Sequence, residues 1–410
     1  MASTTSISTA PADRSIRAAT TCNDGELHSD MLREVLLRLP ARQLCRLRAV
    51  CRAWRSLISD PAFVAAHASR HPGPLVAVGV IAGKFGGMVE LVLLDMSGNI
   101  RKRVPAGGLR HEAKMLTHGH LAAMALDGQC LHVRVVDMES GAVSLVPDRI
   151  QVEHASDPRS QATGGVPVLG RAASGEHKLL RISRKGRDDQ VCHVATIGGG
   201  GGSGWTERPA PPVPVFPRHG RAVVVNGIAY FLVQPARNFW GGARHDFDEP
   251  DGIASFDLAT EQWSPTILRG PVSSCTDDTA EHTAGYESRF QLTALNGRLV
   301  VIHRNVDHCS MDLWFRTGCS SDEGRAPWHR RYVIRYDSEE ARRLAGAVDP
   351  LWELDDGRLA VWCLFSGGYG RLHKVLRTYD PSTNAFADVK EIEEECVGVG
   401  VYTGDILSSY

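Results

Sequence analysis

The hydrophobic positions near the start of the chain repeat with the period of an α-helix. The repeating positions are Leu32, Val35, Leu36 and Leu39. Their spacing of i, i+3, i+4 and i+7 places them on one helical face. Ser29 can cap the first turn through its hydroxyl, and Pro40 disfavours the helical conformation of the residue before it. The pattern predicts an amphipathic helix between Ser29 and Leu39.

A second helical pattern follows directly. Its apolar positions are Leu44, Leu47, Cys51, Trp54 and Ile58. This spacing predicts a single helix of about four turns, which ends at Asp60-Pro61. Two helices joined at a proline form a unit of about 40 residues, and a unit of that size buries too little surface to be stable alone. We therefore expect residues 27–70 to form a helical module whose apolar surface needs a partner.

The pattern changes to β-strands after Pro72-Gly73-Pro74. Short apolar runs there are separated by the dipeptides Asn226-Gly227, Asn296-Gly297 and Asp356-Gly357, which favour tight hairpin turns. An apolar or aromatic residue followed by Asp recurs downstream of these turns. These pairs are Val136-Asp137, Phe256-Asp257, Tyr336-Asp337 and Tyr379-Asp380. The repeating unit is thus four strands, as in a propeller blade.

The turn signals are farther apart than in a compact blade, so the blades are expected to carry inserted loops. They lie 70 and 60 residues apart, whereas a compact blade takes roughly 40–50 residues. Residues 72–410 are predicted to form an irregular β-propeller of about six blades. Five or seven blades, or an irregular β-sandwich, are the alternatives. Residues 338–345 alone indicate a short helix, inserted in a loop. The fold class is therefore α+β multidomain, a small all-α module followed by a large all-β domain.

Composition narrows the class of protein. The 410 residues carry a formal net charge of −1, without the basic excess typical of binding to nucleic acid or a membrane. No run of 18 apolar residues is present, so no membrane-spanning helix is expected. The ten cysteines are scattered without a CxxC pair, which favours reduced thiols, no zinc site, and a location in the cytoplasm or nucleus. Residues 1–26 are expected to be a disordered tail, although Arg14 and Arg17 leave an organellar transit peptide as the alternative.

The helical module is strongly basic. Between Arg33 and Arg55 there are seven arginines and one acid, Glu34. This local excess of positive charge indicates an acidic partner surface. The alternatives are a solvated helix face and binding to nucleic acid, although no Gly-rich, aromatic or helix-turn-helix context supports the latter.

The same residues resemble a known family. The stretch from Leu27 to Pro40 and the core Val50-Cys51-Arg52-Ala53-Trp54-Arg55 are similar to the F-box, with Leu44, Arg46 and Arg48 in register between them. His28 stands where the family usually has proline. The resemblance covers about a tenth of the chain. The β-rich remainder resembles, more weakly, the kelch-like F-box-associated domains of plant F-box proteins.

This resemblance implies partners and contact residues. An F-box binds a Skp-type adaptor and, through it, a cullin and a RING protein. The resemblance assigns the adaptor-facing surface to Leu27, Leu36, Leu39, Pro40, Leu44, Val50, Cys51 and Trp54. Trp54 and Cys51 are expected to be the most internal of these residues.

Sequence motifs for other chemistry are weak. The glycine run at 197–204 is not followed by the Lys-Ser/Thr of a phosphate-binding loop, so it is interpreted as a linker. His118 and His120 would point the same way if both lay in one strand, as a metal chelate requires, but no third ligand can be named. We expect no catalytic residue, metal or cofactor.

A long loop is the best candidate for binding a client protein. Residues 237–249 combine aromatic side chains with both signs of charge, and Trp, Tyr and Arg dominate binding hot spots. Phe239, Trp240 and Arg244 are expected to contact the client. The chain is thus expected to be a non-catalytic substrate receptor of an SCF-type ubiquitin ligase. A β-propeller enzyme and a scaffold that binds the adaptor without promoting degradation are the alternatives.

Overall fold

The computed structural model divides the chain into two compact units, 1–72 and 73–410, and each is described by itself. The structure describes residues 29–39, 44, 47–60, 62–63, 66–67, 73–82, 88–108, 113–126, 132–147, 165, 167–185, 189–198, 204–216, 220–234, 251–272, 290–305, 309–317, 328–336, 344–366 and 372–403. The expected tail at 1–26 lies outside these residues.

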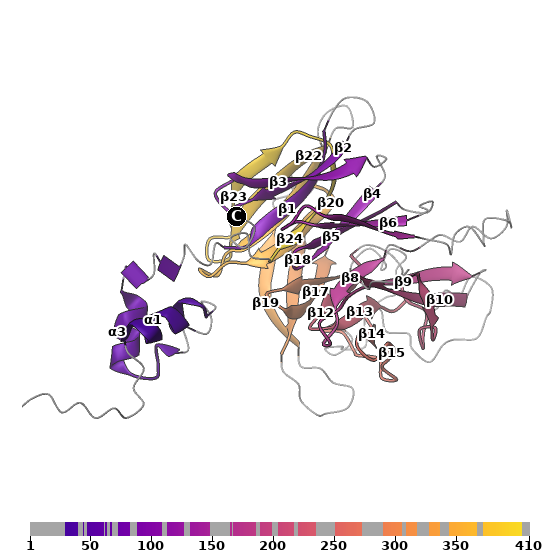
Figure 1. Ribbon diagram of the computed structural model, residues 1–410, viewed down its shortest axis with the longest axis horizontal. Helices are drawn as coiled ribbons and strands as arrows, with labels where there is room; N and C mark the ends of the chain where they lie inside the picture. Colours follow the sequence, from indigo (N-terminus) through magenta and orange to yellow (C-terminus); the bar gives the residue numbers. More distant parts are fainter. Residues whose placement is uncertain are drawn as a thin grey trace, which may run out of the picture. The chain divides into compact units, whose positions relative to one another are not determined.

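The first unit is helical. Helix α1 spans Ser29–Leu37 and helix α3 spans Arg52–Ser59 (Figure 1). The prediction of one continuous second helix is wrong, because the chain turns at residues 48–50 before α3 begins. Cys51 has extended backbone angles and caps α3, its Sγ accepting a hydrogen bond from the Trp54 amide at 3.4 Å. A cap of this kind starts a new helix rather than continuing an old one.

The core of this unit is small. Its buried side chains are Leu36, Leu37, Leu44, Ile58 and Phe63. Arg33 lies over the Phe63 ring and forms an ion pair with Asp60 at 3.7 Å. Arg48 donates a hydrogen bond to the Ser59 hydroxyl at 2.7 Å. Part of the basic excess therefore holds the module together rather than facing a partner.

The second unit consists of six four-stranded antiparallel sheets (Figure 1). From the innermost strand outward, the first three blades are β24 (Cys396–Tyr402), β1 (Leu75–Ala82), β2 (Met88–Leu94) and β3 (Ile100–Gly108); β4 (Ala113–His118), β5 (Leu121–Leu126), β6 (His132–Asp137) and β7 (Val143–Pro147); and β8 (Val168–Arg171), β9 (His177–Lys185), β10 (Asp189–Ile197) and β11 (Thr206–Arg208). The last three are β12 (Ala222–Val225), β13 (Ile228–Leu232), β14 (Ile253–Asp257) and β15 (Gln262–Trp263); β16 (Phe290–Leu295), β17 (Arg298–Asn305), β18 (Ser310–Arg316) and β19 (Trp328–Arg335); and β20 (Leu344–Glu353), β21 (Leu359–Ser366), β22 (Leu372–Asp380) and β23 (Ala385–Ile392).

The six innermost strands form a closed ring. Neighbours contact one another in the order β24, β4, β8, β12, β16 and β20, and β20 contacts β24 again. Strand β24 is the last strand of the propeller and pairs with β1, the first, with Leu75 opposite Tyr402. This arrangement is a six-bladed β-propeller, which confirms the predicted fold and excludes the β-sandwich.

The junction between the first and second blades is unusually close. Gly398 and Gly400 of β24 face Met115 and Thr117 of β4. A Cβ on Gly398 would lie 2.8 Å from the Cβ of Met115, too near for any larger residue. The Val401 amide donates a hydrogen bond to the Thr117 hydroxyl at 3.0 Å. Glycine is required here because the innermost strands of the first and second blades approach so tightly.

The predicted hairpin turns are confirmed in the last three blades. Asn226 and Asn296 have φ of 51° and 50°, and each begins the tight turn between the first two strands of its blade. At the corresponding place in the sixth blade only Gly357 has positive φ, within a longer turn in which Leu354 and Arg358 pair. These turns therefore mark successive blades, as expected.

The recurring Asp has a structural role that its pattern only partly indicated. Asp137, Asp257 and Asp380 each end the third strand of a blade and accept a hydrogen bond from the amide two residues on. Hydrogen bonds from Ser382 hold the pKa of Asp380 below its ordinary value. Asp95 does the same in the first blade, which the pattern missed. The predicted pair Tyr336-Asp337 does not follow a third strand, because Tyr336 comes directly after an outermost strand, β19. Asp337 lies outside the described residues.

The helix expected at 338–345 is partly contradicted. Residues 338–343 lie outside the described residues, but Leu344 and Ala345 begin β20. Strand β20 is the innermost strand of its blade. Pairing with β21 therefore overrides the local helical preference.

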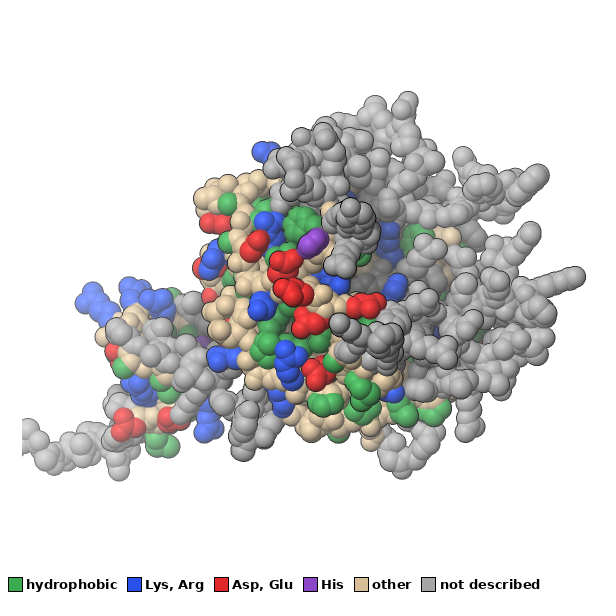
Figure 2. Space-filling model, turned by 90° about the horizontal axis from the view of Figure 1, so that it is seen from above, with side chains coloured by type: hydrophobic (Ala, Val, Ile, Leu, Met, Phe, Trp, Pro, Cys, Tyr) green, Lys and Arg blue, Asp and Glu red, His purple; other side chains and the backbone are tan. Residues whose placement is uncertain are grey.

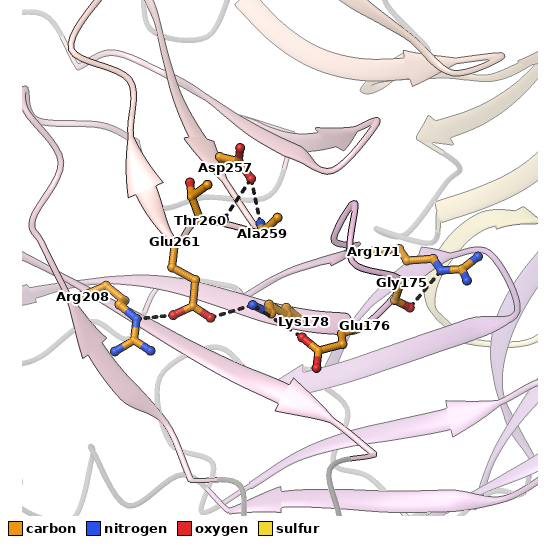
Figure 3. Close-up of polar contacts among 9 residues, drawn as sticks. All are labelled: Arg171, Gly175, Glu176, Lys178, Arg208, Asp257, Ala259, Thr260 and Glu261. Carbon is orange, nitrogen blue, oxygen red and sulfur yellow. Dashed lines mark hydrogen bonds and ion pairs between the residues drawn. The ribbon is translucent and has the colours of Figure 1, made fainter.

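A partly buried ionic contact joins the third and fourth blades. Glu261, in the turn between β14 and β15, accepts a hydrogen bond from Lys178 of β9 at 2.7 Å and another from Arg208 of β11 (Figure 3). Burial raises the pKa of Glu261, but these hydrogen bonds outweigh burial and hold the pKa below its ordinary value. Glu176 also approaches Lys178, at 3.9 Å, but its side chain is largely exposed.

The variant Glu261→Gln should lower the free energy of unfolding by about 1–3 kcal/mol at pH 7, because Lys178 and Arg208 lose their charged acceptor. A lowered folded-state pKa makes the ion pair's contribution complete above the unfolded pKa of about 4.3, and the contribution disappears as pH falls below it. Urea unfolding at pH 7 and pH 4 measures both effects. The matched variant Glu176→Gln should change stability by less than about 0.5 kcal/mol. Equal effects of the two variants would contradict the assignment.

Candidate functional site

Large apolar side chains are exposed on the helical module. Val50 is 63% exposed, Met31 59% and Val35 49%. Met31 and Val35 are four residues apart on α1 and so share one face of that helix. Figure 2 shows basic side chains gathered on the visible face of this unit. Exposed apolar residues beside positive charge are typical of a surface that binds a partner.

The residues assigned to the adaptor surface fall into different environments. Leu36 and Leu44 are buried in the module core, at 1% and 4% exposure, so they support the surface rather than form it. Leu39 is half-buried. Val50 is exposed, at 63%. Leu27 and Pro40 lie outside the described residues.

The expectation that Cys51 and Trp54 are the most internal residues is wrong for Cys51. The Cys51 thiol is exposed, because its place is the cap in front of α3 rather than the inner face of a helix. Trp54 is half-buried and packs against the core cluster. The helical pattern in the sequence did not identify Met31 and Val35 as exposed apolar residues. That pattern placed Val35 on the apolar face of the first helix.

Core and surface positions of the module should separate in a stability experiment. Leu36→Ala removes buried methyl groups and should destabilise the module by about 2–5 kcal/mol. Val50→Ala should change its stability by less than about 0.5 kcal/mol, because the side chain is already in water. Loss of helical circular dichroism on heating the full-length chain measures both variants. A Val50→Ala effect as large as that of Leu36→Ala would show that Val50 is packed in solution.

The centre of the propeller holds a cavity of about 600 Å³. All six innermost strands contribute to its walls. Its middle is lined mainly by apolar side chains, including Val168, Leu292, Leu351 and Val399. Polar side chains also line the cavity, including His118, His120, Arg171 and His177 on the second and third blades and Gln291 and Asp349 on the fifth and sixth. The volume lies within the usual range for small-molecule sites, about 300–1,000 Å³.

The polar groups of the fifth and sixth blades satisfy one another. Arg304 donates hydrogen bonds to Gln291 at 3.0 Å and to Asp349 at 3.2 Å. Gln291 in turn donates to Asp349 at 3.2 Å. The negative charge of Asp349 is therefore balanced by Arg304. This cluster ties the two blades together.

Three histidines gather where the second and third blades meet. His118 ends β4, His120 lies in the turn before β5, and His177 begins β9. The His177 ring centre lies 5.2 Å from that of His120 and 6.1 Å from that of His118. His118 and His120 do not lie as alternate residues of one strand, since Gly119, with φ of 63°, reverses the chain between them. Only the tertiary fold brings in His177.

The histidine cluster disfavours positive charge. Desolvation and the neighbouring His120, His118 and Arg171 together lower the pKa of His177 to about 4, although Asp137 acts in the opposite direction. Desolvation also lowers the pKa of His118, together with Arg171 and His120. The rings of His118 and His177 are therefore neutral at pH 7. Among the described residues, no group of three or more His, Cys, Asp or Glu side chains is arranged to hold a metal ion.

Other predicted features are placed as follows. Phe239, Trp240 and Arg244 lie outside the described residues, so their contact with a client stays a prediction. The five cysteines among the described residues that are not in disulfides are Cys51, Cys192, Cys309, Cys363 and Cys396. Burial raises the pKa of the Cys192 thiol to about 12. Within the described part of the chain, the helices are too short or too polar to cross a membrane.

The fold and the module together define a class of protein: a small helical docking module followed by a six-bladed β-propeller. The F-box domain family matches residues 26–65. A putative F-box protein of Arabidopsis thaliana is 22% identical over 215 residues, 50% of this chain and 51% of the relative. An F-box/kelch-repeat protein of the same plant is 51% identical over 39 residues, 10% of this chain and 11% of the relative.

The chain therefore carries an F-box domain, and its homologues are Arabidopsis F-box proteins, which confirms the resemblance seen in the sequence. The alignments span about half of the length of the first relative and about a tenth of the second.

Solved structures give only distant likenesses. The β-propeller domain of Cps50 (Swd1) from Myceliophteria thermophila has a TM-score of 0.38 at 10% identity, covering 79% of this chain and 84% of that one. AofleA from Arthrobotrys oligospora has a TM-score of 0.38 at 12% identity, covering 80% of this chain and 89% of that one. The propeller assignment is based on the strand order and not on these likenesses.

Proposed function

We propose that this protein is the substrate-recognition subunit of an SCF-type ubiquitin ligase. The observation that supports this most directly is a set of exposed apolar residues, Val50 above all, on a module that matches the F-box domain. A 40-residue module with so small a core gains stability when a partner covers such residues. The proposed partner is a Skp-type adaptor, which connects the chain to a cullin and a RING protein.

The mechanism we propose is proximity. The F-box domain fixes the adaptor, the propeller holds the client, and lysines of the client then meet activated ubiquitin at high effective concentration. The chain itself performs no bond chemistry in this proposal. We place this activity in the cytoplasm or nucleus.

The variant Val50→Asp should reduce capture of the adaptor and cullin by at least tenfold, because a charge replaces an apolar contact at the centre of the proposed surface. Affinity capture of the tagged full-length chain, followed by mass spectrometry, measures the yield. Ser56→Asp, an exposed position on α3, is the matched control and should leave the yield unchanged. Undiminished capture by Val50→Asp, in a chain whose helical circular dichroism is normal, would refute the proposal.

We propose that Phe239, Trp240 and Arg244 contact the client. Trp240→Ala should lower the recovery of clients by about tenfold or more, the effect expected of a hot-spot aromatic residue, while adaptor capture stays normal. Leu372→Ala, at an exposed apolar position of β22, is the control. Client recovery that is equal in both variants would place recognition elsewhere. Captured clients that are never ubiquitinated in a reconstituted reaction would instead favour the non-degradative scaffold.

A further inference from the structure

One part of the propeller channel carries three histidines and an arginine that has no ion-pair partner among the described residues. His118, His120, His177 and Arg171 all line the cavity at the junction of the second and third blades. Arg171 is exposed, and its Nε donates a hydrogen bond to the Gly175 carbonyl oxygen at 3.0 Å (Figure 3). Among the described residues, no carboxylate forms an ion pair with Arg171. This differs from Arg304, which Asp349 neutralises at 3.2 Å.

Asp137, the carboxylate that acts on the His177 pKa, already accepts hydrogen bonds from its own turn. Asp137 accepts hydrogen bonds from the amides of Glu139 and Ser140, at 2.8 and 3.2 Å, so it closes its own turn. Its attraction for a proton on His177 is outweighed by Arg171 and the two other imidazoles. His118 Nδ1 is buried without a hydrogen-bond partner. The cluster therefore combines one positive charge with a buried imidazole nitrogen that has no hydrogen-bond partner, and no carboxylate among the described residues pairs with that charge.

The rest of the cavity sets the size and character of a ligand. Beyond the histidines its walls are mainly apolar, including Val168, Leu169, Val224 and Val401, with polar groups such as Asn226, Gln291 and Asp349 on the other blades. A volume of about 600 Å³ accommodates a small organic molecule. One guanidinium matches one carboxylate, whereas a multiply charged phosphate would leave charge unpaired in this partly buried site.

We propose that the central channel binds a small carboxylic acid, with its carboxylate at Arg171 and the histidines and its apolar body between the innermost strands. The ligand supplies the negative charge that the cluster lacks. The imidazoles of His118, His120 and His177 and the guanidinium of Arg171 face the carboxylate, with Asp137 the opposing charge. This site does not depend on the F-box domain or on an adaptor.

Benzoate is the probe for the first experiment, with benzamide as its neutral analogue and inorganic phosphate as a second anion. The purified full-length chain is titrated with each, and the histidine ring resonances are followed by NMR as pH is varied. Benzoate should bind saturably and raise the pKa of His177 from about 4 toward its ordinary value. Its affinity should then increase as pH falls from 7 to 5, a range in which a carboxylate of ordinary pKa, about 4, stays ionised.

Variants locate the site. Arg171→Gln should weaken benzoate binding at least fivefold, and His177→Gln should abolish its pH dependence. His373→Gln, which alters an exposed histidine paired with Glu391 in the sixth blade, should bind like the unaltered chain. Benzoate that fails to shift the His177 resonance, binds no better than benzamide, or binds more weakly than phosphate would overturn the proposal. Normal benzoate binding by a correctly folded Arg171→Gln variant would do so as well.

Discussion

The structure depends on the pairing of its last strand with its first. Strand β24 supplies the innermost strand of the first blade, and without it β1 would expose an unpaired edge and the ring of innermost strands would stay open. Unpaired strand edges are costly and prone to aggregation. Gly398 and Gly400 let β24 approach β4 closely enough to close the ring. The whole propeller is thus joined through residues more than 300 positions apart, such as Leu75 and Tyr402.

Polar contacts between blades add to this closure. Glu261 joins the third and fourth blades through Lys178 and Arg208, and Arg304 joins the fifth and sixth through Asp349. In both contacts the carboxylate is paired with a side chain of opposite charge. The histidine cluster between the second and third blades is the exception among the described residues. Burial lowers the pKa values of His118 and His177, and Arg171 and the neighbouring imidazoles lower them further.

The two units present different kinds of surface. The F-box domain has a small core and exposed apolar residues, which suits binding to a flat protein partner. The propeller has a closed scaffold with a central cavity, which suits recognition by loops or by the channel. Arg33 and Arg48 show that a basic segment need not be entirely devoted to a partner, because both hold the helices of the module together. An excess of arginine in a short module can therefore serve the packing of the module itself.

The sequence by itself determined the features that are local. Helical spacing and the Val50–Arg55 core identified the F-box, and the turns at Asn226-Gly227 and Asn296-Gly297 marked the blades, because these signals depend on neighbours a few residues away. It could not show that Cys51 caps a separate helix or that Leu344 joins a strand, since these outcomes depend on competing contacts in the folded chain. The histidine cluster was decided by tertiary structure alone. His177 reaches His118 and His120 only when the second and third blades pack side by side, and no spacing along the chain records that approach.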